Sequence, residues 1–158
     1  MMTYQNSNIK IIYVFALILF LFVGCENEQK PFPYARVNVT LDIGTELNNI
    51  VKGQYVFIEP EDCSEAESCG YGGLIIFRAS QNNFQAFDRA CTYNPKEKCL
   101  LEPFGGDRSN NILSCPCCGS LFNLGESGRV LQSPATRGLQ QYQTKYDKNS
   151  NQIIVTNY

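Results

Sequence analysis

The sequence of 158 residues contains no histidine. Histidine is the usual base that activates a serine or cysteine nucleophile, and it is the side chain that titrates near neutral pH. Its absence excludes imidazole ligands to a metal and a histidine-activated nucleophile. No pair of carboxylates stands in a recognisable catalytic motif either. The sequence therefore predicts a protein that is not an enzyme.

Basic clusters, internal repeats, heptads and low-complexity tracts are also missing. The chain has 13 Lys and Arg against 15 Asp and Glu, a formal net charge of −2. That balance, without a basic patch, argues against a nucleic-acid partner. No window has the apolar stripe of an amphipathic helix.

Strand patterns dominate instead. Apolar residues either alternate with polar ones, as in a half-buried strand, or form short runs bounded by Gly and Pro. These patterns predict an all-β domain, an antiparallel β-sandwich or barrel with long loops. The expected strands cover residues 37–43, 55–58, 74–77 and 83–87, with a hairpin of 142–146 and 153–155 around the turn 147–151.

The N-terminal segment has the features of an export signal. Residues 1–24 carry one charged side chain, Lys10, followed by an apolar run that is shorter than the roughly 20 residues that span a bilayer. The run ends in the sequence LFVGC, which resembles a bacterial lipobox whose cysteine, here Cys25, is lipidated. We therefore expect attachment to membrane lipid through Cys25 in the bacterial cell envelope, on the outer membrane or facing the periplasm or the surface.

The domain organisation follows from this. A lipoprotein signal peptide covers residues 1–24, and the polar, proline-punctuated segment 25–33 is expected to be a lipidated tether. The remaining length, residues 34–158, is that of one domain.

Two cysteine-rich segments carry the strongest motif in the chain. They read Cys-Thr-Tyr at 91–93 and Cys-Pro-Cys-Cys-Gly-Ser at 115–120. They resemble the two cluster-binding loops of Rieske [2Fe–2S] proteins of the cytochrome bc type, with Tyr93 and Cys118 where the ligand histidines stand. The resemblance continues through a hairpin at 123–130 and a proline loop at 132–135, and it implies a Rieske-like β-domain.

Seven cysteines follow Cys25, an odd number that cannot all pair within the chain. The resemblance implies a disulfide between Cys99 and Cys117 that ties the two loops together. Cys63 and Cys69 bracket a short segment and are expected to close it. The cysteines that remain occupy ligand positions: Cys91, Cys115 and Cys118.

The first interpretation of these positions keeps a [2Fe–2S] cluster in an electron-transfer role. Its ligands would be Cys91, Cys115, Cys118 and a fourth donor, either the Tyr93 phenolate or Cys99 if the disulfide is absent. Thiolates in place of imidazoles should lower the reduction potential toward roughly −400 mV.

The same resemblance implies roles for residues around the cluster. The hydroxyl of Ser120 would bond a cluster sulfide, and backbone amides near Gly119 would tune the potential. Pro134 lies on the loop that would cover the cluster from a third side.

The N-terminus argues against a preassembled cluster. Clusters are built in the cytoplasm, and a loaded domain crosses the membrane folded, a route addressed by a twin-arginine signal. Residues 1–10 contain no arginine. A general secretory signal implies that the chain arrives unfolded and without its cluster.

Two further interpretations therefore stay open. Zinc would take Cys115 and Cys118 of the knuckle with Cys91 and Cys99 as a Cys₄ site. Alternatively the site holds no metal, Cys91 pairs with Cys115 or Cys118, and the domain is a disulfide-stabilised structural or binding module. A redox partner or a surface protein partner is expected accordingly.

Overall fold

A computed structural model of the protein describes residues 30–64 and 68–157. The signal segment 1–24, Cys25 and the first part of the tether lie outside the described residues, so the expected lipid anchor stays a prediction. Within the described ranges, no helix has the length and apolar character needed to cross a membrane.

The described residues form strands joined by loops and short 3-10 turns, as the all-β prediction requires. The strands are β1 (Val37–Asp42), β2 (Tyr55–Ile58), β3 (Ser68–Cys69), β4 (Leu74–Ser80), β5 (Asn83–Asp88), β6 (Glu102–Pro103), β7 (Ile112–Ser114), β8 (Leu121–Asn123), β9 (Arg129–Gln132), β10 (Gln141–Asp147) and β11 (Gln152–Thr156). The 3-10 turns are η1 (Pro60–Asp62), η2 (Pro95–Glu97), η3 (Phe104–Gly106) and η4 (Leu124–Glu126).

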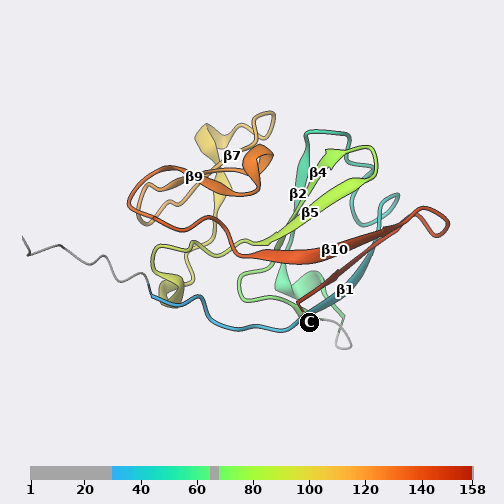
Figure 1. Ribbon diagram of the computed structural model, residues 1–158, viewed down its shortest axis with the longest axis horizontal. Helices are drawn as coiled ribbons and strands as arrows, with labels where there is room; N and C mark the ends of the chain where they lie inside the picture. The colour runs from blue at the N-terminus through green and yellow to red at the C-terminus, as the bar shows by residue number, and fades with distance from the viewer. Residues whose placement is uncertain (1–29, 65–67, 158) are drawn as a thin grey trace, which may run out of the picture.

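The strands form two antiparallel sheets (Figure 1). The large sheet has the order β2-β4-β5-β10-β11-β1-β3 and curls toward a closed barrel. The small sheet, β6-β7-β8-β9, packs beside it. One cysteine loop leaves β5 of the large sheet and leads to β6, and the other connects β7 to β8 of the small sheet. The site therefore lies where the two sheets meet.

Strands β4 and β5 are buried on both faces. Leu74 and Ile76 pack into the core inside the large sheet, together with strands β1 and β11. Ile75 and Phe77 point the other way, into a second core shared with Leu113 and other residues of the small sheet. Burial on both sides explains why residues 74–77 of β4 form a continuous apolar run rather than an alternating one.

Most of the expected strands are confirmed. Residues 55–58 form β2, the 37–43 pattern forms β1, and the C-terminal hairpin pairs β10 with β11 up to Asp147 opposite Gln152. Strands β3 and β6 of two residues and β7 of three were not predicted. Such short strands show no periodicity that a sequence can reveal.

Asp88, the last residue of β5, is a fully buried carboxylate that fixes the start of the first cysteine loop. It accepts hydrogen bonds from the backbone N–H groups of Tyr71 at 2.7 Å, Gly72 at 3.0 Å and Ala90 at 2.8 Å. A fourth comes from the Tyr142 hydroxyl at 2.7 Å. A Cβ at Gly72 would lie 2.7 Å from the Ala90 nitrogen, so only glycine allows this close approach.

Arg89, the next residue, also holds the start of the first cysteine loop. Its guanidinium forms an ion pair with Glu59, lies 4.1 Å from the ring centroid of Phe57, and donates to the Leu101 carbonyl at 2.9 Å. The side chains of Asp88 and Arg89 therefore both hold the chain in place shortly before Cys91.

We predict that Asp88→Asn destabilises the domain by roughly 2–4 kcal/mol. The amide replaces an acceptor oxygen by a donor NH₂ group that faces N–H donors already in place. Tyr142→Phe removes only the hydroxyl bond and should cost less. Urea denaturation measures both. Asp147→Asn, at the end of β10, is the control, because this carboxylate accepts from the Asn149 N–H, a bond that an amide oxygen can keep. An Asp88→Asn midpoint equal to that of the control would contradict this role.

Candidate metal centre

The first cysteine loop is closed at its base by backbone hydrogen bonds. The Cys91 N–H donates to the Cys99 carbonyl at 2.9 Å, and the Leu101 N–H donates to the Arg89 carbonyl at 2.9 Å. Ala90 and Leu100 form an isolated bridge between them. The loop is thus a wide hairpin that starts and ends at a cysteine.

The second cysteine loop is a tight turn between β7 and β8. The Cys115 N–H donates to the Ser120 carbonyl at 2.9 Å, and the Gly119 N–H donates to the Cys115 carbonyl at 2.8 Å. Gly119 has a φ of 75°, a conformation that favours glycine. The turn therefore places both of its ligand-position cysteines, Cys115 and Cys118, on one small loop.

The structure joins Cys99 to Cys117 and Cys63 to Cys69, the two pairings expected from the sequence. The first of these disulfides ties the two cysteine loops together. Because its sulfur is bonded to Cys117, Cys99 is not a thiolate donor here. The two expectations that used Cys99 as a fourth ligand, in a cluster or in a Cys₄ zinc site, are therefore wrong for this structure.

The proline loop is bonded to the second cysteine loop. The Ala135 N–H donates to the buried Ser120 hydroxyl at 2.9 Å, and the Gln132 amide donates to the Gly119 carbonyl at 3.0 Å. Pro134 lies half-buried between these two contacts. Gln132 was not singled out from the sequence, because a polar residue at a strand end gives no signal of such a contact.

The same loop also reaches the first cysteine loop. The hydroxyl of Thr92, a fully buried residue next to Cys91, donates to the Arg137 carbonyl at 2.7 Å. Three segments that are distant in sequence thus enclose one point.

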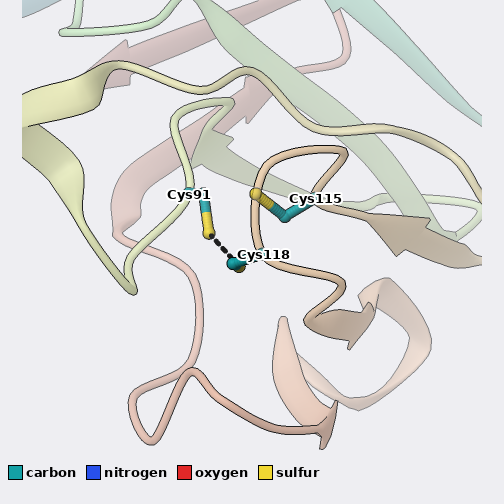
Figure 2. Close-up of side chains that lie close together, drawn as sticks. All are labelled: Cys91, Cys115 and Cys118. Atoms are coloured by element: carbon teal, nitrogen blue, oxygen red, sulfur yellow. Dashed lines mark hydrogen bonds between the residues drawn. The ribbon is translucent and has the colours of Figure 1, made fainter.

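Cys91, Cys115 and Cys118 are unpaired thiols that meet at this point (Figure 2). Their sulfur atoms all lie within 4.8 Å of one another, and those of Cys91 and Cys118 are 3.7 Å apart. Cys91 and Cys115 are each 2% exposed, whereas Cys118 is half-buried. The group is therefore open to solvent mainly on the Cys118 side.

The disulfide between Cys99 and Cys117 lies next to Cys115. The sulfur of Cys115 is also within 4.8 Å of the sulfurs of Cys99 and Cys117. Cys115 is thus in contact with both sulfur groups, and the disulfide packs against the candidate centre.

Backbone N–H groups are directed at all three free sulfurs. Tyr93 donates to Cys91, Cys117 and Cys118 donate to Cys115, and Ser120 donates to Cys118. Donors of this kind stabilise a thiolate and tune a metal bound to it.

Burial and hydrogen bonding separate the acidities of the three thiols. Burial raises the pKa of Cys91 and of Cys115 despite the N–H donors. Burial alone would also raise the pKa of Cys118, but the Ser120 hydroxyl, 3.1 Å from its sulfur, and the Ser120 N–H outweigh it and lower the pKa. Cys118 is therefore both the most accessible and the most acidic of the three.

No described contact joins the Tyr93 side chain to the three sulfurs. Its side chain is 45% exposed, and its contact with Cys91 is made by its backbone N–H. The phenolate as a ligand stays a prediction.

The comparison with known families agrees with this geometry. The Rieske [2Fe-2S] domain family matches residues 49–143, a range that contains both cysteine loops and the proline loop. The chain belongs to this family. No curated protein matches the chain.

The donors of this Rieske domain do not fit the usual Rieske centre. That centre holds one of its two irons through two imidazoles, and the chain has no histidine. By the resemblance of the two cysteine motifs, Tyr93 and Cys118 would stand at the two imidazole positions. What the site offers is three sulfur donors, and soft thiolates suit zinc, copper(I) and iron–sulfur chemistry.

We predict that Ser120→Ala slows alkylation of Cys118 by iodoacetamide in metal-free protein by about three- to tenfold at fixed pH. Loss of the hydroxyl donor raises the pKa of Cys118, so a smaller thiolate fraction is present and the rate profile moves to higher pH. Mass spectrometry follows the reaction. Ser133→Ala, an exposed serine on the proline loop, is the matched control; equal rates in both variants would contradict the assignment.

Removal of the Cys99–Cys117 disulfide tests whether this bond holds the two cysteine loops together. Its cysteines are 18 positions apart, so the chain-entropy argument gives a loss of about 3 kcal/mol for Cys99→Ser/Cys117→Ser.

The matched control is Cys63→Ser/Cys69→Ser, whose cysteines are 6 positions apart and whose removal should cost about 1 kcal/mol less. Thermal unfolding measures both. Removal of the Cys99–Cys117 disulfide, but not of the Cys63–Cys69 disulfide, should also make Cys91 accessible to an alkylating reagent. Unchanged protection of Cys91 would show that the disulfide does not hold the loops together.

Proposed function

We propose that this protein is an electron-transfer-type module of the bacterial cell envelope that binds a metal centre through the thiolates of Cys91, Cys115 and Cys118. The convergence of their three sulfurs within 4.8 Å carries the proposal. Membership of the Rieske family supports the class, because this fold holds iron–sulfur centres in electron transfer.

The chain's own residues suit a negatively charged sulfur site. Burial of Cys91 and Cys115 excludes water, and N–H donors reach every sulfur. A bound redox-active metal would supply one-electron transfer. With thiolates instead of neutral imidazoles around it, its potential would be lower than in histidine-ligated Rieske proteins and would not vary with pH through imidazole titration.

The envelope location rests on the N-terminal sequence. A signal of 24 residues ending before Cys25 supports export and lipid anchoring, with segment 25–33 as the tether. The partner would then be a redox or surface protein of the same compartment. A carrier or binding role, rather than an enzyme, agrees with the absence of histidine.

One observation favours a second function, a metal-free scaffold stabilised by disulfides. The sulfurs of Cys91 and Cys118 are 3.7 Å apart, close enough to form a third disulfide with little movement. In an oxidising compartment this reaction competes with metal binding. The domain would then serve as a structural or binding module.

Metal analysis and a visible spectrum of protein isolated from its native membrane test the proposal. We predict bound metal in the wild type and its loss in Cys91→Ser, Cys115→Ser and Cys118→Ser. The double variant Cys63→Ser/Cys69→Ser, whose sulfurs lie elsewhere, should keep the metal.

Intact-mass analysis of the same sample separates the two functions. The proposed metal centre predicts two disulfides and three thiols that become reactive after chelation. Three disulfides and one thiol, with no metal, would contradict the metal centre and favour the scaffold.

A further inference from the structure

We propose that Cys91, Cys115 and Cys118 form a three-thiolate site for a single thiophilic metal ion with an open fourth position, in place of a two-iron cluster. The inference rests on the proposed function in one respect, that these three cysteines bind metal. It adds the number of ions, the coordination and the class of metal.

The spacing of the sulfurs is that of ligands to one ion. Zinc–sulfur bonds are about 2.3 Å long, so sulfurs at two corners of a tetrahedral zinc site lie roughly 3.8 Å apart. The sulfurs of Cys91 and Cys118 are 3.7 Å apart, and Cys115 is within 4.8 Å of both. A shift of about 1 Å or less at Cys115 would therefore complete three corners of one tetrahedron.

The position of Cys118 separates this arrangement from a two-iron centre. In a Rieske centre the two cysteine positions, here Cys91 and Cys115, bind one iron, and the two histidine positions, here Tyr93 and Cys118, bind the other. Ligands of different irons stand on opposite sides of the bridged pair. Here the Cys118 sulfur lies 3.7 Å from the Cys91 sulfur, as expected for ligands of one ion rather than of two (Figure 2).

A second iron would have almost no ligands in this site. Cys118 lies beside Cys91, and Tyr93, the other histidine counterpart by the resemblance, is 45% exposed and has no described side-chain contact with the three sulfurs. Cys99 and Cys117 are consumed by their disulfide. The described residues therefore offer donors for one ion and not for two.

The surroundings offset the charge of such a site. Three thiolates around a divalent ion leave one net negative charge. Four backbone N–H groups, those of Tyr93, Cys117, Cys118 and Ser120, and the Ser120 hydroxyl point at the sulfurs. Burial of the complex is then compensated by hydrogen bonds.

The open fourth position lies on the accessible side. Cys118 is half-buried while the other two cysteines are 2% exposed, so water or a small exogenous ligand reaches the metal past Cys118. Three protein ligands with an open position are typical of reactive rather than purely structural zinc sites. The ion expected is a thiophilic one that can change its oxidation state, such as a single iron, because zinc(II) has no redox chemistry and could not carry the proposed electron transfer. Cobalt(II) serves as a spectroscopic probe and cadmium(II) as a soft analogue.

The first experiment measures stoichiometry in the full chain purified under anaerobic conditions. A single-ion site predicts one metal per chain without acid-labile sulfide. Two irons and two sulfides per chain would overturn the single-ion inference and leave the proposed function intact. Protein that neither contains metal nor takes up cobalt(II) would overturn both.

The second experiment is a cobalt(II) titration of metal-free protein with variants. Cys118→Ser should weaken binding by more than about 100-fold, because even outer partners of metal ligands are worth 10- to 100-fold. Equal affinity in Cys118→Ser and the wild type would reject the inference. The double variant Cys63→Ser/Cys69→Ser is the control for loss of unrelated cysteines.

Tyr93→Phe separates the two arrangements directly. A single-ion site of three thiolates predicts no change in cobalt(II) affinity beyond twofold. A centre that uses the phenolate as its fourth ligand predicts a large loss and a changed absorption spectrum. The latter result would overturn the open fourth position.

Discussion

The disulfide between Cys99 and Cys117 joins a loop that leaves the large sheet to a loop that belongs to the small sheet. The relative position of the two loops is set by this bond, by the shared core between the sheets and by hydrogen bonds from the proline loop. Asp88 and Arg89 hold the first loop where it starts. The approach of the three thiols is the result of these constraints together.

The backbone of the second cysteine loop shapes the site. The tight turn at Gly119 and the buried hydroxyl of Ser120 position Cys118, the residue that by the resemblance would stand at an imidazole position. Replacing imidazole by a thiol at position 118 adds negative charge and shortens the reach of the side chain. Both effects would favour a compact sulfur site over an extended centre, as the proposed single-ion site requires.

Much of this arrangement was accessible from the sequence. Alternation predicted β1 and the C-terminal hairpin. The family resemblance of the two cysteine motifs implied both loops and the Cys99–Cys117 disulfide, and the close spacing of Cys63 and Cys69 predicted the other disulfide, which left three thiols. The role of Asp88 was not accessible, since an aspartate after an apolar strand is equally typical of an exposed turn. Distances between sulfurs were not accessible either, because spacing along a chain does not define how closely two loops approach. Cys99 as a cluster ligand depended on the absence of the disulfide, which the structure contains.

X-ray absorption spectroscopy at the edge of the bound metal tests the central claim most directly, because it counts the sulfur neighbours of the ion without depending on activity. Convergence of Cys91, Cys115 and Cys118 on one ion predicts three sulfur neighbours in a single shell, one lighter neighbour, and no second metal nearby. A metal–metal distance in the spectrum, or a shell with fewer than three sulfurs, would contradict it.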